Sequence, residues 1–76
     1  MLRQPTQKQV QREIGRRLKA ARLTAGMTQQ GVAEAAEVDY KRYQDLEGGR
    51  VNPTVKTLLR LAGALGIDFW SLLQNG

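Results

Sequence analysis

The 76-residue sequence predicts an all-α domain, a compact bundle of five short helices. Three observations support this fold class. Apolar residues recur at the three- and four-residue spacing of amphipathic helices, threonine or aspartate stands before most of these segments as an N-cap, and no stretch alternates as a strand would. Because domains usually have about 100 to 150 residues, we expect one domain over residues 10–76. Residues 1–9 are expected to form an N-terminal arm or an extension of the first helix.

The first helix is expected to begin at Thr6, because Thr6 and Gln9 have the spacing of a capping box. Its apolar stripe consists of Val10, Ile14, Leu18 and Ala21. Gly15 lies within this helix and lowers its intrinsic stability by about 1 kcal/mol relative to alanine. Gly26 is the expected stop, since glycine is common just beyond a helix end.

The second helix is expected over residues 29–36, with Thr28 as its N-cap. Its apolar face is made of small residues, namely Val32, Ala33 and Ala36. Small side chains allow another helix to cross close by. The connection that follows is so short that the next helix must cross this one rather than run parallel to it.

The third helix is expected from Tyr40 to about Leu46, with Asp39 as its N-cap. Only Tyr43 and Leu46 are spaced to face a core, and the Tyr43 hydroxyl is expected at its rim. The remaining side chains of this helix are polar or amphipathic and face outward. The helix is therefore polar for its length.

The fourth helix is the most apolar segment of the chain and is expected over residues 55–65, with Thr54 as its N-cap. Its core candidates are Val55, Leu58, Leu59, Leu61, Ala62 and Leu65. Gly66 is the expected left-handed C-cap. Asp68 is expected to cap a final short helix that runs through Leu73.

The composition excludes several classes of function. The chain has no cysteine and no histidine, which removes disulfides, the commonest metal ligands and the commonest general base. With no glycine-rich phosphate loop and no nucleophile beside a base, we expect no enzyme activity, no metal and no cofactor. No apolar stretch approaches the roughly 18 residues of a membrane span, and the N-terminus lacks the apolar run of a secretory signal. We therefore expect a cytoplasmic protein with no membrane partner.

The charge pattern points to a polyanionic partner. Twelve basic and seven acidic residues give a net charge of +5, and the isoelectric point of about 10.3 exceeds the value of about 9 that is typical of nucleic-acid binders. Residues 1–22 hold seven basic and one acidic side chain, residues 23–49 hold two and five, and residues 50–76 hold three and one. Charge alone leaves RNA open, but the few aromatic residues and the absence of a predicted sheet favour duplex DNA.

Two tightly connected helices, the second polar on its outward side, are what insertion into a major groove about 12 Å wide requires. The chain from Ile14 to Leu73 resembles the phage-repressor and Cro-like helix-turn-helix family. The resemblance rests on Arg22, Gly26-Met27-Thr28-Gln29, Val32-Ala33, Leu46-Glu47 with Gly49, Asn52-Pro53, and Leu65-Gly66-Ile67 with Leu72-Leu73. The resemblance implies a lambda-repressor-like fold and a repressor-like, homodimeric transcriptional regulator. The sequence departs from the family pattern at two positions. Glu37 stands in the turn between the second and third helices, where the family commonly has glycine. Gly31 lies within the second helix.

The resemblance places the start of the third helix against base edges. Tyr40 and Lys41 are the leading base-reading candidates, because lysine donates to guanine O6 and N7 and tyrosine donates or packs on a thymine methyl. Asp45, one turn further along, would accept from cytosine N4 or pair with an arginine such as Arg42. The alternative for all of them is an ordinary solvated helix surface.

The resemblance also implies a set of phosphate contacts. Gln29 matches a glutamine that acts as a phosphate clamp, in agreement with the affinity of helix N-termini for phosphate. The candidates are Thr28, Gln29, Arg42, Gln44, Arg50, Asn52 and Lys56. Ordinary surface residues are the alternative, notably for Lys56. Arg22 and Glu47 match a family pair that forms an internal salt bridge.

Self-association is the expected way to lengthen the recognised site, because one helix reads only a few base pairs. Phe69, Trp70 and Leu73 are the candidate dimer contacts, and closure of the core is the alternative for all three. A second class of function remains open at this point: small antitoxins of this fold neutralise a partner protein and bind DNA secondarily.

Overall fold

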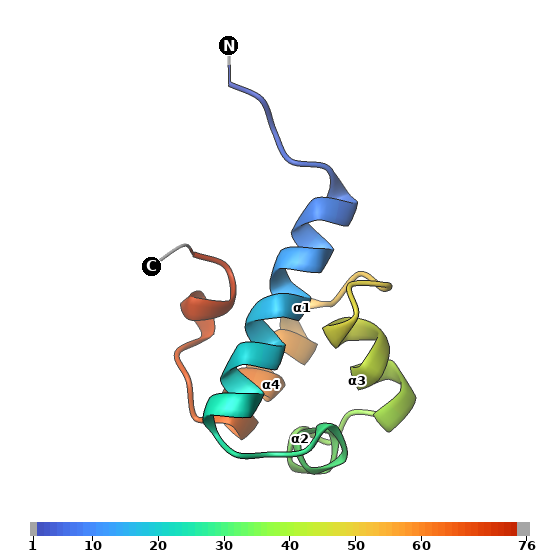
Figure 1. Cartoon of the computed structure of the whole chain (residues 1–76), viewed down its shortest axis with the longest axis vertical. Helices are drawn as coiled ribbons and strands as arrows, with labels where there is room; N and C mark the ends of the chain where they lie inside the picture. Colours follow the sequence, from blue (N-terminus) through green and yellow to red (C-terminus); the bar gives the residue numbers. More distant parts are fainter. Residues whose placement is uncertain (1, 75–76) are drawn as a thin grey trace.

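The computed structural model describes residues 2–74, which form four α-helices and one turn of 3-10 helix and no strand (Figure 1). The elements are α1 (Gln7–Thr24), α2 (Gln29–Ala36), α3 (Tyr40–Glu47), α4 (Val55–Leu65) and η1 (Phe69–Leu72). The all-α class is confirmed, and the fifth element is a single 3-10 turn rather than an α-helix. Residues 2–6 extend away from the helical body, so the arm ends before α1 begins at Gln7. No helix in the described part of the chain is both long and apolar enough to cross a bilayer.

Side-chain caps start the four α-helices at the predicted residues. Thr6 and Gln9 form the complete capping box, with bonds of 3.1 and 2.9 Å. The side chains of Thr28, Asp39 and Thr54 each accept a hydrogen bond from a main-chain N–H three residues on. The prediction for Asp68 is wrong, because its side chain makes no capping hydrogen bond. Its main-chain oxygen closes the 3-10 turn instead, accepting from the Ser71 N–H at 3.0 Å and the Ser71 hydroxyl at 2.6 Å.

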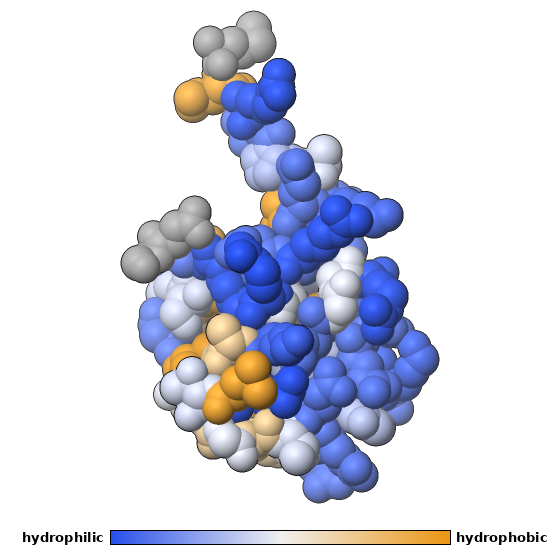
Figure 2. Space-filling view, viewed as in Figure 1, coloured by the Kyte–Doolittle hydropathy of each residue, from blue (hydrophilic) through white to orange (hydrophobic). Residues whose placement is uncertain are grey.

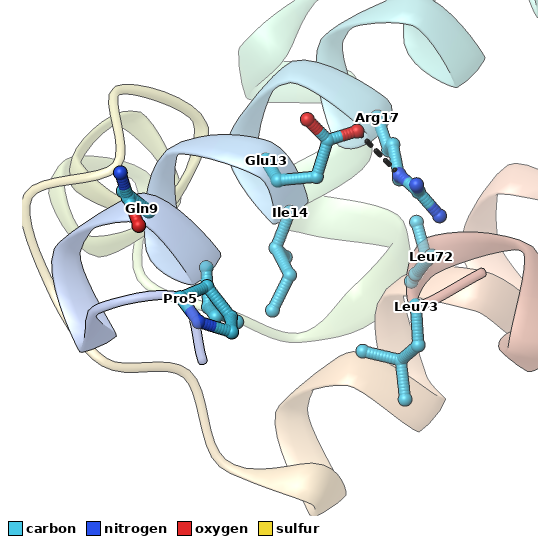
Figure 3. Close-up of a pocket in the computed structure, with 8 residues that line it drawn as sticks. Pro5, Gln9, Glu13, Ile14, Arg17, Leu72 and Leu73 are labelled. Atoms are coloured by element: carbon cyan, nitrogen blue, oxygen red, sulfur yellow. Dashed lines mark hydrogen bonds and ion pairs between the residues drawn. The ribbon is translucent and has the colours of Figure 1, made fainter. Parts of the chain in front are cut away.

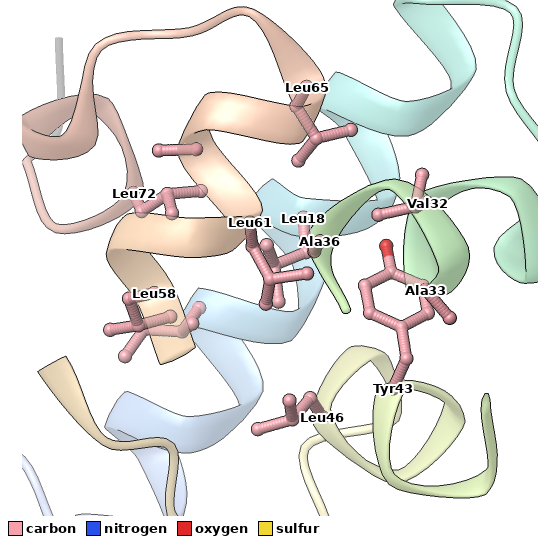
Figure 4. Close-up of a cluster of buried hydrophobic side chains, with 12 residues drawn as sticks. Leu18, Val32, Ala33, Ala36, Tyr43, Leu46, Leu58, Leu61, Leu65 and Leu72 are labelled. Carbon is pink, nitrogen blue, oxygen red and sulfur yellow. The ribbon is translucent and has the colours of Figure 1, made fainter. Parts of the chain in front are cut away.

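The core lies where α1, α2, α3 and α4 face one another (Figure 4). Its buried members are Ile14, Leu18, Val32, Ala33, Ala36, Tyr43, Leu46, Leu58, Leu61, Ala62, Leu65 and Leu72. Three predicted core residues lie outside it: Val10, Val55 and Leu59 are 41%, 65% and 53% exposed. Leu59 is off the stripe that α4 buries, Val55 lies in the first turn of α4, and Val10 lies in the first turn of α1.

Gly15 of α1 lies directly against the backbone at the C-terminal end of α3. A Cβ atom at this position would lie 2.8 Å from the main-chain oxygen of Leu46 and closer still to that of Glu47. No side chain fits there without moving a backbone. The glycine that weakens α1 as an isolated helix is therefore required for the docking of α3 against α1.

The turn between α2 and α3 is strained at the predicted residue. Glu37 has φ 57° and ψ 44°, and it is the only residue other than glycine with positive φ in the described chain. Its N–H and that of Val38 donate back to main-chain oxygens of α2, including a 2.9 Å bond from Val38 to Ala33. A residue with a Cβ thus occupies a left-handed conformation in place of glycine, at modest energetic cost.

Most of the visible surface is hydrophilic (Figure 2). On the helical body, the apolar colour gathers over the C-terminal end of α1 and the segment between α4 and η1. A hollow of about 390 Å³ lies in this region, lined by Ala20, Ala21, Thr24, Ala25, Leu65, Gly66 and Ile67.

Candidate functional site

The outward face of α3 carries the two leading base-reading candidates. Tyr40 is 43% exposed, and the Lys41 side chain is 74% exposed. Tyr43 and Leu46 of the same helix are buried. The helix is therefore fixed to the core along one face and presents the other to solvent.

Asp45 is held between two cations. The Lys41 Nζ lies 2.9 and 3.1 Å from its two carboxylate oxygens, and the Arg50 Nε lies 3.1 Å from Oδ1. Lys41 first and Arg50 second hold the pKa of the Asp45 carboxyl below its usual value. The predicted pairing of Asp45 with Arg42 is wrong, because the Arg42 side chain is exposed and makes no bond to Asp45 in the described structure. The helical i,i+4 spacing brings Lys41 to Asp45, and the turn after α3 brings Arg50 back over it.

Arg22 of α1 and Glu47 of α3 form a bidentate ion pair. The Arg22 Nε and Nη2 donate to the two Glu47 carboxylate oxygens at 2.9 and 2.8 Å, and Nη1 donates to the main-chain oxygen of Met27 at 3.1 Å. The two side chains are only 12% and 5% exposed. The hydrogen bond to Glu47 raises the pKa of Arg22. Burial raises the pKa of Glu47, but the hydrogen bonds that it accepts outweigh burial and hold that pKa below its usual value.

Tyr43 is completely buried and lies beside this ion pair. Its hydroxyl makes no hydrogen bond within residues 2–74, so the predicted position at the rim of the core is wrong. Burial, and then the neighbouring Glu47 carboxylate, raise the pKa of the hydroxyl. The tyrosine ring occupies the place between α2 and α3 that the small residues of α2 leave open (Figure 4).

A polar hollow of about 340 Å³ lies between α1, α2 and the C-terminal end of α3. It is lined by Lys19, Gln29, Gln44, Glu47, Gly48 and Arg50. Three predicted phosphate ligands, Gln29, Gln44 and Arg50, come together there. The Gln29 amide nitrogen donates to Glu47 Oε1 at 3.2 Å. Lys19 was not predicted as a site residue, although the excess of basic residues in 1–22 is the signal that pointed to this part of α1.

The other predicted phosphate ligands lie outside this hollow. Thr28, Arg42, Asn52 and Lys56 are exposed and do not line it. The Thr28 hydroxyl oxygen accepts from the Gly31 N–H at 3.0 Å. Their exposure leaves them accessible to a ligand.

The predicted dimer contacts have different environments. Phe69 packs against the core, whereas Trp70 and Leu73 are 57% and 44% exposed. The two aromatic rings meet edge to face with centroids 5.1 Å apart. Leu73 lines a hollow of about 350 Å³ between α1 and η1, with the 2.8 Å Glu13–Arg17 ion pair on its wall (Figure 3). Phe69 therefore serves the core, and the free apolar surface belongs to Trp70 and Leu73.

Four α-helices, a tight crossing of α2 and α3, and an outward polar face on α3 define a helix-turn-helix domain. Residues 13–68 match the family described as helix-turn-helix domain, and the chain belongs to that family. This confirms the resemblance to phage-repressor-like regulators.

Relatives and solved structures agree with this assignment. The chain is 43% identical over 55 residues to the immunity repressor protein of Bacillus phage phi105, covering 72% of this chain and 38% of the repressor. It is 38% identical over 59 residues to the HTH-type transcriptional regulator DdrOP3 of Deinococcus deserti, covering 78% of this chain and 46% of the regulator. The chain thus spans less than half the length of either relative. Its fold matches the restriction-modification controller protein C.AhdI from Aeromonas hydrophila with a TM-score of 0.81 and 28% identity, covering 83% and 96% of the two chains.

Proposed function

We propose that this chain is a sequence-specific DNA-binding domain of a repressor-like transcriptional regulator, which inserts α3 into the major groove. The observation that carries the proposal is the two-sided character of α3, with Tyr43 and Leu46 buried and Tyr40 and Lys41 exposed at its start. A helix used for base readout needs this rigidity on one side and this access on the other. The family membership of the chain supports the same conclusion.

The polar residues divide by role in this proposal. Lys41 and Tyr40 read base edges, and Asp45 joins them when a base amino group replaces one of its two cations. Residues around the ends of α2 and α3 contact phosphates and set the register of the domain on the duplex. The ion pair between Arg22 and Glu47 holds α3 to α1, so its role is structural.

A homodimer completes the proposal. Trp70 and Leu73 form an exposed apolar surface at the C-terminal end of the described chain, and single exposed tryptophans are typical anchors of protein interfaces. A symmetric pair would read two half-sites about 34 to 36 Å apart. Light scattering at binding concentrations should give the mass of two chains, and Trp70→Ala should lower it to one. A monomeric wild-type mass would refute the dimer.

Selection of bound duplexes from a random pool tests the DNA proposal. The wild-type chain should enrich a defined sequence, Lys41→Ala should relax the preference at one position, and Gln29→Ala should weaken binding to all sequences alike. Arg60→Ala is the matched control, because Arg60 is an exposed cation of α4 that lines a separate hollow beside α2. Enrichment of no sequence, or an unchanged preference in Lys41→Ala, would contradict the assignment.

A further inference from the structure

We propose that Arg17 of α1 is a positioning residue of the dimer: it fastens the η1 segment to α1 and thereby selects the spacing of the two half-sites that the dimer binds. The inference rests on the proposed function, because it takes the homodimer through Trp70 and Leu73 as given. Arg17 was not among the predicted site residues. Its side chain is only 15% exposed, and it bonds to main-chain oxygens 54 and 57 positions further along the chain.

The Arg17 guanidinium joins α1 to the last residues of the described chain. Its Nε donates to Glu13 Oε2 at 2.8 Å, which fixes the guanidinium on the surface of α1 (Figure 3). Its Nη1 donates to the main-chain oxygen of Ser71 at 3.3 Å and also to that of Gln74. Within residues 2–74, no other side chain from outside η1 bonds to residues 69–74. Arg17 therefore supplies the polar attachment of this segment to the helical body.

The η1 segment has few other attachments. It is a four-residue 3-10 turn without a side-chain cap. Leu72 is buried in the core and Phe69 packs against it, but Trp70 and Leu73 are exposed. Short elements with few buried contacts open locally at a low cost in free energy. The direction in which Trp70 and Leu73 face therefore depends on Arg17.

The first helix, α1, lies between η1 and α3 (Figure 1). Gly15 and Arg22, seven residues apart on α1, face α3, whereas Arg17 faces η1. With 3.6 residues per turn, position 17 lies about 200° around the helix from position 15. A dimer that joins through η1 thus connects its two α3 helices through the α1 helix of each chain. Arg17 makes this connection rigid at its η1 end.

The rigidity of this connection matters because the position of the second half-site changes steeply with spacing. One additional base pair moves it by about 3.4 Å and rotates it by about 34 to 36° around the duplex axis. A rigid dimer cannot follow this change, so only one of its α3 helices stays in its groove. A dimer whose η1 segments swing on α1 can follow it. Arg17 is therefore a specificity-determining residue for spacing, although it lies on the side of α1 away from α3.

Amide hydrogen exchange measured by NMR without DNA tests the fastening itself. The N–H groups of residues 73 and 74 both donate to the main-chain oxygen of Trp70, at 2.9 and 3.0 Å, and so report the opening of this segment. Arg17→Met should raise their exchange rates about tenfold and leave the amides of α4 unchanged. Arg16→Met is the matched control, since Arg16 also bonds to Glu13 but is 75% exposed and makes no bond to η1 in the described structure. Equal exchange of residues 73 and 74 in the two variants would overturn the proposal.

A series of duplexes with two copies of the selected half-site, separated by spacers that differ by single base pairs, tests the role in spacing. Each variant is used at a concentration at which light scattering gives the mass of two chains. A change of one base pair from the best spacer should lower the affinity of the wild type and of Arg16→Met about 100-fold, because simultaneous binding of both half-sites is lost. The same change should lower the affinity of Arg17→Met less than about tenfold, and its affinity for a single half-site should equal that of the wild type. A general loss of stability would lower all these affinities together and leave the spacing preference intact.

The outcomes separate this role from the proposed function. A dimeric wild type, with the same spacing preference in Arg17→Met as in Arg16→Met, would overturn the role of Arg17 and leave the dimer unaffected. A wild type that is monomeric at binding concentrations would refute the dimer and this role together, and would leave DNA binding by the single domain unaffected. An Arg17→Met variant that stays monomeric where Arg16→Met is a dimer, with the hydrogen exchange of α4 unchanged, would support the positioning role.

Discussion

Replacing Glu47 by alanine should destabilise the domain severely. The Arg22 side chain is only 12% exposed in the wild type. The substitution leaves its guanidinium without the Glu47 carboxylate and removes two charged hydrogen bonds of 2.8 and 2.9 Å. Loss of one partner of a buried pair typically costs about 3 to 5 kcal/mol. A domain of this size has a free energy of unfolding of about 4 to 11 kcal/mol. Glu47→Ala should therefore lose about half of it, lowering the melting temperature by at least about 12 °C.

The assay is thermal and urea unfolding followed by circular dichroism, with three further variants. Glu34→Ala is the matched control, since Glu34 is an exposed α2 carboxylate whose described bond is a long one of 3.5 Å to Gln30. Arg22→Met and the double variant Arg22→Met/Glu47→Ala complete a double-mutant cycle with Glu47→Ala. The double variant should be more stable than Glu47→Ala, because it leaves no buried charge unpaired. A Glu47→Ala melting temperature within the error of Glu34→Ala, or additive losses in the cycle, would refute the account.

Three further predictions concern other parts of the molecule. Gly15→Ala should destabilise the fold by about 1 to 3 kcal/mol in urea unfolding, because its Cβ meets the α3 backbone. Gly63→Ala has open space around its Cβ and should stabilise the fold by about 1 kcal/mol in the same assay. A Gly15→Ala variant more stable than the wild type would contradict the close approach of α1 and α3. Asp45→Asn frees two cations and should steepen the salt dependence of binding to unselected duplexes by up to about 2 in slope, and an equal change in Glu34→Gln would exclude a local cause. Since the folded-state pKa of Glu47 lies below its ordinary value of 4.5, its contribution is complete above that value and is lost as the pH falls through the folded-state pKa. Urea unfolding should show less loss in acid for Glu47→Gln than for the wild type, and parallel curves would contradict this.

The boundaries of the helices could be predicted from the sequence because they depend on neighbouring residues. Thr6, Thr28, Asp39 and Thr54 each satisfy N–H groups within one turn, so the chemistry of a cap is complete in four residues. The prediction for Asp68 was wrong because the main-chain oxygen of Asp68, and not its side chain, accepts the hydrogen bond that closes the 3-10 turn. The spacing of apolar residues located the buried face of α4 but also included Val55 and Leu59, which are exposed. Spacing within one helix does not show how far the helices packed against it extend.

The environment of the candidate site could be predicted only in part, because it depends on contacts between elements. The pairing of Arg22 with Glu47 followed from a family resemblance, and no local pattern connects residues 25 positions apart. The placement of Lys19 beside Arg50 depends on how closely α1 meets α3, which Gly15 sets. The choice of Arg50 over Arg42 as a partner of Asp45 likewise depends on the path of the chain after α3.

The folded arrangement also answers an electrostatic difficulty in the sequence. Residues 23–49 contain five acidic and two basic side chains, although they include the helix that is proposed to meet a polyanion. Two of those carboxylates, Asp45 and Glu47, are paired with cations in the structure, and Asp39 is used as a cap. The partners come from outside α3 as well as within it: Arg22 from α1 and Arg50 from the following loop. Because Arg22 and Arg50, from the basic segments on either side, pair with Glu47 and Asp45, the negative charge of residues 23–49 is partly neutralised in the fold. In the proposed complex, affinity for phosphate would come from α1 and the loop after α3, and selectivity from α3 itself.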